Sequence, residues 1–235
     1  MRRVLVTRPE PGASETAARL VRMGFEPIVL PLTEIVPLHP AASVGKVDVV
    51  AVTSPNAIRH APRSTLDALR GKPVFAVGSR TGDAARAAGL NVVDDEAGDA
   101  ERLAARIDAA FTIPAHATVL CGRVRRDVLE TRLVEAGHHP HLIEIYDTLP
   151  LEPAERAVQE VIGERRVDDV LLHSANGAAQ LTRLMERSDI GTKLAAATFY
   201  CLSERIAGVL GQDAAKNARI ADFPSEDRLL ILLKT

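Results

Sequence analysis

Short polar segments that follow apolar, β-rich stretches hold the side chains that could do chemistry. Ser54 and Asn56 come at the end of the apolar stretch 47–53, and Ser174 follows the stretch 170–173 in the same way. Hydroxyls and free backbone N–H groups at the start of a helix form a small anion site. The same residue types also serve as ordinary helix N-caps, so both interpretations of Ser54 and Asn56 stay open. The recurrence at Ser174 favours binding.

A third segment of this kind runs from Gly78 to Thr81. It lacks the lysine of a Walker A loop and the three-glycine spacing of a dinucleotide fingerprint, so neither nucleotide motif is present. We expect its glycine to allow a sharp turn and the Thr81 hydroxyl to lie near a helix start. Arg8, after the first apolar stretch, adds a guanidinium that could bind a carboxylate.

The segment 121–126 begins with a cysteine, ends at Arg126 and carries three arginines. It is one residue too short for a phosphatase cradle, which excludes that function. Its arginines would meet carboxylates or cover a solvated helix start, and solvation is the more common role for exposed arginine. The histidines at 138–141 surround a proline that breaks the geometry needed to align them on a metal, so no metal site is predicted.

Tyr146 is one of only two tyrosines, and it lies in a segment, 144–153, that holds two prolines. We expect this segment to be an extended hinge because proline fixes φ and resists helix formation. A phenol with an ordinary pKa of about 10 is a proton or hydrogen-bond donor at neutral pH. The alternative is a tyrosine that only packs its ring, which is the more frequent case.

The apolar stretches that carry these segments are short, and they alternate with stretches rich in Ala, Leu and Arg. We expect strands at 4–7, 26–30, 47–53, 74–77, 92–94, 118–121, 141–145, 170–173, 198–202 and 218–221. We expect helices to end at Gly24, Gly89, Gly137 and Gly211. The alternation predicts parallel sheets, on which ligands bind beyond the carboxyl ends of the strands.

The second half of the chain repeats the plan of the first. The spacing of Arg, Leu, Val, Gly and Pro in 19–27 recurs in 132–140, and the pattern of 47–56 recurs in 167–176. Two similar α/β units with facing loop edges form a cleft, and such a cleft usually holds a ligand. The repeat therefore predicts two similar parallel-sheet α/β lobes with an active site in the inter-lobe cleft.

Two proline-containing segments, 31–40 and the one that holds Tyr146, suggest how the lobes are connected. One solution pairs them as a hinge, so that 1–35 and 150–235 share the first lobe and 38–145 forms the second. A single cut between the two repeats is the competing division, and the pattern alone leaves both open.

Composition excludes several classes of partner. Aromatic residues make up 3% of the chain and tryptophan is absent, which argues against base-stacking platforms for nucleic acid. The net charge of −2 gives no field to attract nucleic acid or an anionic membrane. No apolar run reaches membrane-spanning length. Cys121 and Cys201 lie in apolar contexts, which favours buried thiols in a reducing cytoplasm.

Taken in order, these motifs resemble the uroporphyrinogen-III synthase family over nearly the whole chain. The series consists of Val4-Leu5-Val6-Thr7-Arg8-Pro9, Pro31-Leu32, Val52-Thr53-Ser54-Pro55-Asn56-Ala57, Ala76-Val77-Gly78-Ser79-Arg80-Thr81, Leu120-Cys121-Gly122 with Arg125-Arg126, Ile145-Tyr146-Asp147-Thr148 and His173-Ser174-Ala175-Asn176. The resemblance implies two α/β lobes joined by connecting strands at 32–37 and 143–149, with the chain entering one lobe, building the other and returning. That selects the interleaved division.

The resemblance also implies a reaction. Hydroxymethylbilane, a linear tetrapyrrole, loses water and closes to uroporphyrinogen III with inversion of ring D, without cofactor or metal. Tyr146 is then the candidate to assist departure of the hydroxyl. The candidate substrate-binding residues are Arg8, Ser54, Asn56, Gly78, Thr81, Arg126 and Ser174. We expect a monomer. The segment 202–205 departs from the family pattern, and no contact is carried over to it.

Two alternatives come from other classes. A non-catalytic, two-lobed protein that closes on a small molecule is the first; such proteins are often exported, and no signal peptide is evident. A regulatory module with response-regulator-like lobes is the second. It would need an aspartate at the carboxyl end of a strand, whereas Asp48 lies at the opposite end of its predicted strand.

Overall fold

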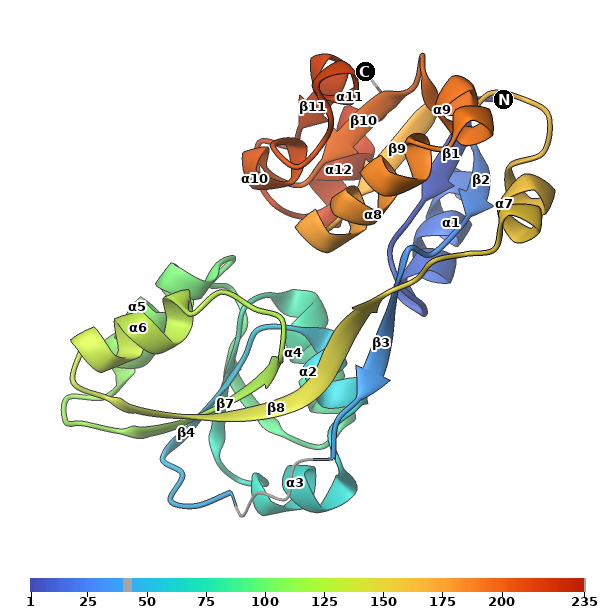
Figure 1. Ribbon diagram of the computed structural model, residues 1–235. Coiled ribbons are helices and arrows are strands. Elements are labelled where there is room, and N and C mark those ends of the chain that lie inside the picture. The colour runs from blue at the N-terminus through green and yellow to red at the C-terminus, as the bar shows by residue number, and fades with distance from the viewer. Residues whose placement is uncertain (40–43, 235) are drawn as a thin grey trace. The chain divides into compact units, whose positions relative to one another are not determined.

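The structure is a computed structural model that describes residues 1–39 and 44–234 (Figure 1). Of the segment predicted as extended at 31–40, Pro40 lies outside the described residues. The chain divides into two compact units: unit 1 comprises Met1–Ile35 with Leu149–Thr235, and unit 2 comprises Val36–Thr148. Within the described ranges, no helix is long and apolar enough to cross a membrane.

Unit 1 is built on a five-stranded sheet in which all neighbouring strands are parallel. The strand order is β11 (Ala218–Ile220), β10 (Thr198–Cys201), β9 (Asp169–Leu172), β1 (Arg3–Val6) and β2 (Glu26–Val29). The helices are α1 (Gly12–Arg22), α7 (Glu155–Ile162), α8 (Ala175–Met185), α9 (Ser188–Leu194), α10 (Glu204–Ala207), α11 (Gln212–Lys216) and α12 (Glu226–Leu232).

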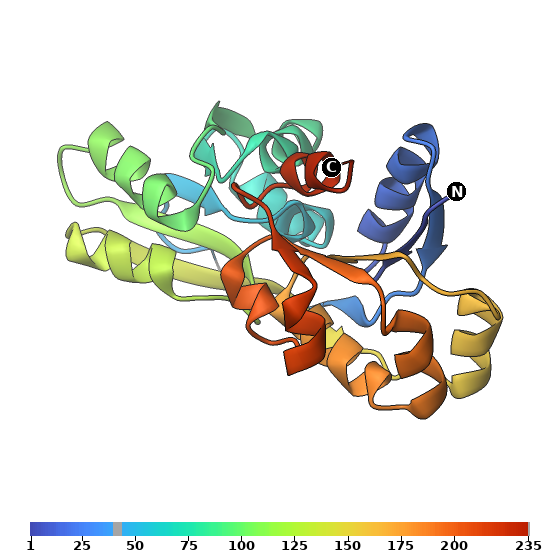
Figure 2. The same ribbon diagram turned by 90° about the horizontal axis from the view of Figure 1, so that it is seen from above.

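Helices cover both faces of this sheet, which explains why its central strands β1, β9 and β10 are almost wholly buried. On β1, Val4 and Val6 pack in one buried cluster with Leu229 of α12. Leu5, between them, points to the other face and packs in a cluster with Leu181 of α8. The helices α8 and α9 pack against each other, as the orange part of the chain shows in Figure 2.

Unit 2 is built on a six-stranded sheet. The strand order is β3 (Thr33–Pro37), β8 (His139–Pro150), β7 (His116–Gly122), β4 (Val49–Val52), β5 (Pro73–Ala76) and β6 (Asn91–Asp94), and the pairs from β8 to β6 are parallel. The helices are α2 (Pro55–Arg59), α3 (Arg63–Ala68), α4 (Ser79–Ala87), α5 (Ala100–Ala110) and α6 (Val128–Glu135).

The central strand β4 shows how this sheet is buried. Val49 and Ala51 belong to the cluster that includes Leu103 of α5. Val50 belongs to the opposite cluster, which includes Ile58 of α2. Because both faces are covered, a ligand can reach this sheet at the carboxyl ends of its strands, and the predicted site residues of this unit lie there except for Tyr146, which is part of β8.

The strand β8 differs from its prediction. The sequence predicts a strand at 141–145 followed by an extended hinge, whereas the structure has one continuous strand of 12 residues. The run between Pro140 and Pro150 is rich in β-branched, aromatic and leucine residues, which favour a pleated strand. Its pairing with β7 shifts register between Cys121 and Gly122, and this irregularity brings Gly122 opposite Tyr146.

Three of the four predicted helix-ending glycines adopt the left-handed conformation expected of them. Gly24, Gly89 and Gly137 have φ angles of +86°, +80° and +84° and follow α1, α4 and α6. The prediction for Gly211 is wrong. This residue has a φ of −59° and precedes α11 as its N-cap. Here Gly208 is the C-cap of α10.

Candidate functional site

The predicted site residues divide between the two units, and all except Tyr146, which lies within β8, follow the carboxyl ends of strands. In unit 2 lie Ser54 and Asn56 after β4, Gly78 and Thr81 after β5, Arg126 after β7, and Tyr146 on β8. In unit 1 lie Arg8 after β1 and Ser174 after β9.

Tyr146 is held by contacts on several sides. Its carbonyl oxygen accepts a hydrogen bond of 2.8 Å from the Arg123 N–H. Its ring lies against Gly122, so closely that a Cβ atom added there would be 2.7 Å from Tyr146 Cζ and 3.0 Å from its hydroxyl oxygen. The His60 ring is tilted toward it with the centroids 6.4 Å apart. The Ser54 side chain lies close enough to the Tyr146 hydroxyl to lower its pKa.

Burial decides the protonation of this cluster. Loss of solvent raises the pKa of the Tyr146 phenol, and this effect exceeds the lowering that the nearby Ser54 side chain causes. The phenol therefore keeps its proton at neutral pH. Burial, followed by the nearby charge of Arg59, lowers the pKa of His60, which favours its neutral imidazole. The cluster thus presents an uncharged proton donor.

Ser54 is also the N-cap of α2. Its Oγ accepts a hydrogen bond of 3.2 Å from the Asn56 N–H. This bond uses a lone pair of Ser54 Oγ and leaves the Ser54 O–H available to donate to the Tyr146 oxygen. The phenolic proton of Tyr146 can then be donated to another group. The cap and the contact with Tyr146 are therefore compatible, and the two interpretations of Ser54 do not exclude each other.

Gly78 and Thr81 lie at the start of α4. Gly78 has a φ of −173°, which is extended backbone, so the prediction that its glycine allows a sharp turn is wrong. A Cβ atom added at Gly78 would meet nothing within 4 Å, so the space beside it is open. Thr81 is buried, with 3% of its surface exposed, and its N–H donates to the Gly78 carbonyl at 2.9 Å.

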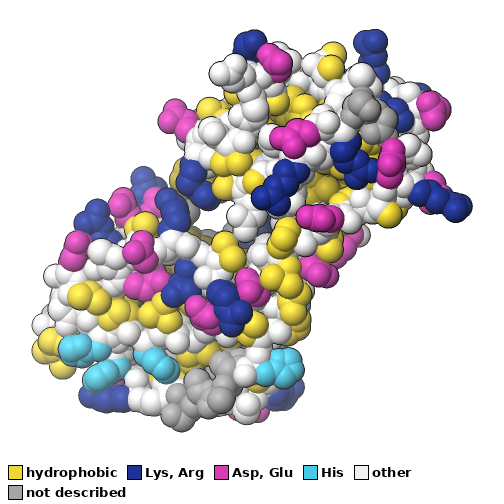
Figure 3. Space-filling view, in the orientation of Figure 1, with side chains coloured by type: hydrophobic (Ala, Val, Ile, Leu, Met, Phe, Trp, Pro, Cys, Tyr) yellow, Lys and Arg dark blue, Asp and Glu magenta, His cyan; other side chains and the backbone are white. Residues whose placement is uncertain are grey.

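The arginines that follow β7 differ in how their charges are balanced. Arg123 pairs with Glu144 at 3.1 Å and with Asp147 at 3.3 Å, and Arg125 pairs with Glu144 at 3.0 Å. Arg126 is exposed, and no described acidic side chain lies within ion-pair distance of it. Positive and negative side chains are interspersed over the face seen in Figure 3. Because its charge is not balanced by a described carboxylate, Arg126 is the arginine of this segment best able to bind a carboxylate of a ligand.

In unit 1 the charge of Arg8 is compensated internally. Its Nη1 lies 3.2 Å from Glu226 Oε1 and donates to Thr16 Oγ1 at 3.3 Å. The Glu226 carboxylate is buried and also pairs with Arg19 at 3.3 Å. A Cβ atom on Gly12 would be 2.6 Å from Arg8 Nε, so the glycine makes room for the guanidinium. These contacts give Arg8 a structural role beside any binding role.

Ser174 begins α8 as its N-cap. Its Oγ accepts a hydrogen bond of 3.0 Å from the Gly177 N–H. The neighbouring Thr7 hydroxyl donates to the Leu171 carbonyl at 3.1 Å, so it is occupied within the sheet. Ser174, like Ser54, is therefore the N-cap of the helix after its strand, but it accepts from the N–H three residues on, whereas Ser54 accepts from the N–H two residues on.

Sequence reasoning missed two members of the Tyr146 cluster, Gly122 and His60, as site residues. A glycine as the last residue of a buried strand is a weak signal that another group approaches closely. His60 carries no such signal, because it follows α2 as an isolated histidine and meets Tyr146 only through the tertiary fold.

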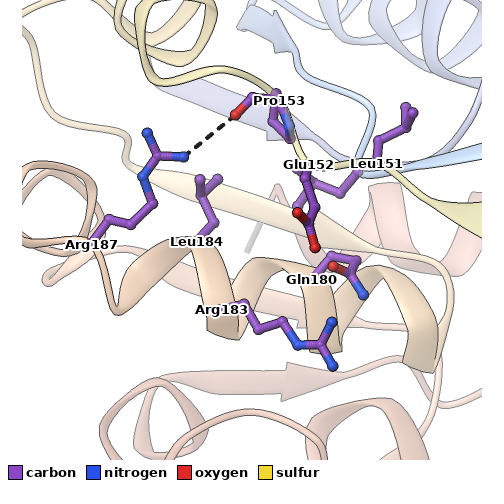
Figure 4. A pocket seen from close by; sticks show the side chains of 8 residues that line it. Leu151, Glu152, Pro153, Gln180, Arg183, Leu184 and Arg187 are labelled. Atoms are coloured by element: carbon purple, nitrogen blue, oxygen red, sulfur yellow. Dashed lines mark hydrogen bonds between the residues drawn. The ribbon is translucent and has the colours of Figure 1, made fainter.

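A separate pocket of about 180 Å³ lies in unit 1, between α8 and the segment that follows β8 (Figure 4). Its lining consists of Leu32, Leu151, Glu152, Pro153, Gln180, Arg183, Leu184 and Arg187. Arg187 donates to the Pro153 carbonyl at 3.4 Å. The pocket is smaller than most small-molecule sites, which span about 300–1,000 Å³, and none of the predicted site residues lines it.

No three or more His, Cys, Asp and Glu side chains come together as a possible metal site in the described part of the chain. The two cysteines, Cys121 and Cys201, are buried and unpaired. The chemistry available at the Tyr146 cluster is therefore that of hydroxyls, an imidazole, backbone N–H groups and nearby arginine.

Comparisons with known proteins agree with this architecture. Uroporphyrinogen-III synthetase from Helicobacter pylori 26695 has a similar structure, with a TM-score of 0.67 and 16% identity over 100% of this chain and 99% of that chain. A mutant uroporphyrinogen III synthase from the extremely thermophilic bacterium Thermus thermophilus has a TM-score of 0.58 and 16% identity, covering 100% and 98%. At these identities the likeness shows the fold.

The family itself is shown by the sequence. The comparison with curated proteins found no match. A family model described as uroporphyrinogen-III synthase HemD matches residues 14–231, which includes all the predicted site residues except Arg8. The chain therefore belongs to the uroporphyrinogen-III synthase family.

Proposed function

We propose that this chain converts hydroxymethylbilane to uroporphyrinogen III, by loss of water and ring closure with inversion of ring D. The family match over residues 14–231 supports the reaction class. The observation that carries the mechanism is the Tyr146 phenol, which is partly buried, protonated and close to the Ser54 side chain. It is a proton donor that lies beside the His60 imidazole, whose lowered pKa favours its neutral form.

Tyr146 supplies the proton that the leaving hydroxyl needs. As the C–O bond breaks, the pyrrole electrons form an azafulvenium cation and the hydroxyl takes the phenolic proton to leave as water, so that Tyr146 is left as tyrosinate. Ring D then attacks through its substituted carbon, forms a spiro intermediate, reopens and recloses inverted. The closing pyrrole loses a proton as it regains aromaticity, and this proton returns to the Tyr146 oxygen, so the enzyme is restored.

The remaining candidates bind and orient the substrate. Its acetate and propionate carboxylates suit the exposed guanidinium of Arg126 and the backbone N–H groups near Ser54 and Ser174. The open space beside Gly78 admits a bulky group close to the backbone. The pyrrole electrons drive the departure of the hydroxyl. The main task of the protein is therefore to hold the linear tetrapyrrole in the geometry for spiro attack and to prevent direct closure.

We also propose that the enzyme works as a monomer in the cytoplasm, with its linear tetrapyrrole as its partner and no nucleic acid. The buried, unpaired thiols of Cys121 and Cys201 support a reducing compartment. That the substrate is bound in a cleft between the two lobes stays a prediction.

An isomer assay tests the proposal. Purified protein is mixed with freshly generated hydroxymethylbilane, the products are oxidised, and type I and type III uroporphyrins are separated by chromatography. We expect predominantly type III, because spontaneous closure gives type I. Type I alone, from protein shown to be folded by circular dichroism, would overturn the proposal and favour a non-catalytic binding protein.

A further inference from the structure

Gly122 occupies a position where the backbone does not need a glycine. It is the buried last residue of β7, and its φ angle is not positive. Glycine in a strand loses more conformational entropy on folding than alanine does and contributes no packing. Neither a turn nor a strained backbone requires glycine at this position. The requirement must therefore come from the group that occupies the space next to its α-carbon.

What lies there is the ring of Tyr146. A Cβ atom on Gly122 would be 2.7 Å from Cζ, 2.8 Å from Cε2 and 3.0 Å from the hydroxyl oxygen of Tyr146. Real Cβ atoms essentially never come as close as the first two of these distances, so any side chain would push the ring away. The contact is at the end of the ring that carries the reactive hydroxyl.

The rest of the cluster leaves the ring little freedom to adapt. Its backbone is fixed by the hydrogen bond from the Arg123 N–H to the Tyr146 carbonyl, directly beside the register shift. The ring packs against the buried cluster that includes Ile145, with His60 on another side. Displacing the ring would therefore separate its hydroxyl from Ser54 rather than move the whole cluster together.

We propose that Gly122 is a positioning residue: its missing side chain sets where the Tyr146 hydroxyl lies and keeps it in contact with Ser54. The kinetic part of this inference rests on the proposed function, whereas the positioning itself does not. Gly122 makes no contact of its own with substrate in this proposal, and it acts only through Tyr146.

The first test reads the phenol directly. The chain has two tyrosines and no tryptophan, so tyrosinate formation can be followed by near-ultraviolet absorbance, and the difference from Tyr146→Phe isolates the Tyr146 signal. In Gly122→Ala we expect the Tyr146 titration to move down toward its ordinary midpoint of about 10 as the ring becomes exposed. Gly211→Ala is the matched control, because a Cβ there meets only Thr182 Cγ2 at 4.0 Å.

The second test is a double-mutant cycle on turnover of hydroxymethylbilane. Gly122→Ala should lower kcat about 10- to 100-fold with little change in KM, the size expected of a misplaced reacting group. In the Tyr146→Phe background the same substitution should have no further effect, since the hydroxyl is already gone. Independent, multiplying effects, or a Gly122→Ala variant with unchanged titration and kcat, would overturn the inference.

A third variant guards against loss of folding. If Gly122→Ala lowers the melting temperature sharply, the same substitution made in a Tyr146→Ala background should lower it much less, because removal of the ring makes room for the new methyl group. An equal loss in both backgrounds would show that the ring is not what excludes a side chain at Gly122. If the parent enzyme makes no type III product, the proposed function fails, and the titration still decides the positioning of Tyr146.

Discussion

The Tyr146 hydroxyl shows how opposing local effects set the chemistry of a single residue. The nearby Ser54 side chain stabilises the ionised phenol and so lowers its pKa, whereas burial stabilises the neutral form and raises it; burial is the larger effect. The Tyr146 phenol is therefore a weaker acid in the free enzyme than an exposed tyrosine is. The proton is released only to a group whose basicity rises as its bond breaks, which is the situation of a departing hydroxyl.

Replacing Tyr146 with phenylalanine tests this role with the smallest change in shape. We expect kcat for type III product to fall about 100-fold or more, in the range of general acid catalysis, while the melting temperature changes little because the ring still packs. Stopped assays of uroporphyrin isomers measure the rate. Tyr200→Phe is the control for loss of a tyrosine hydroxyl elsewhere, and a Tyr146→Phe rate equal to that of the parent enzyme would remove Tyr146 from the mechanism.

The arginines after β7 give a second prediction at this scale. Arg126→Gln should raise KM for hydroxymethylbilane about 3- to 30-fold, as loss of one charge-assisted hydrogen bond would, with kcat nearly unchanged. Arg123→Gln is the matched control, since its guanidinium is already paired with Glu144 and Asp147. Initial rates over a range of substrate concentrations give the KM of each variant. Equal KM values for both variants would contradict a binding role specific to Arg126.

At the scale of elements, the sequence predicts strands better than it predicts how they pair. The strands at 26–30 and 198–202 are found within one residue of their expected bounds, because buried parallel strands are short unbroken apolar runs. The length of β8 and the register shift at Gly122 depend on the pairing of β8 with β7, so neither can be predicted from the local sequence pattern. For this reason Tyr146 could be singled out from the sequence while its contacts with Gly122 and His60 could not.

Helix ends provide a prediction that compares two glycines of different conformation. Gly137→Ala should lower the free energy of unfolding by about 1 kcal/mol, because alanine is strained at its φ of +84°. Gly211→Ala should leave that free energy unchanged or raise it slightly, since alanine adopts a φ of −59° without strain. Urea denaturation followed by circular dichroism measures both. Equal losses in the two variants would show that the end of α6 does not depend on the left-handed residue.

At the scale of the whole molecule, one buried thiol lies in the core of each unit. Burial raises the pKa of Cys121 to about 11 and that of Cys201 to about 12, from 9.0 for an exposed thiol. Above the unfolded pKa of 9.0 the unfolded chain loses these protons while the folded chain keeps them. By linkage, the stability that these neutral thiols contribute is present below about pH 9 and is lost as the pH rises through the folded values.

We therefore expect the free energy of unfolding to fall as the pH rises from about 9 to 11, by an amount on the order of 1 kcal/mol per thiol or more. Denaturant titrations at a series of pH values measure this slope. Cys201→Ala should show a shallower decline than the parent protein over the same interval, even if it is less stable at neutral pH. A parent protein whose stability stays constant up to about pH 11 would contradict the predicted contribution of the thiols.

The order of the units along the chain affects how the protein is made. Unit 2 is one continuous segment, Val36–Thr148, and it can fold on the ribosome as soon as that segment has emerged. Unit 1 cannot, because β1 pairs with β9 and Arg8 pairs with Glu226, both of which belong to its later part. Because most of the chain separates β1 from β9, at about 5–20 residues per second the apolar face of β1 and α1 stays uncovered for roughly 10–30 s of synthesis. Once Thr148 has emerged, the nascent chain carries a complete unit 2 behind an unfinished first piece of unit 1, whose apolar face is the surface for a chaperone to cover.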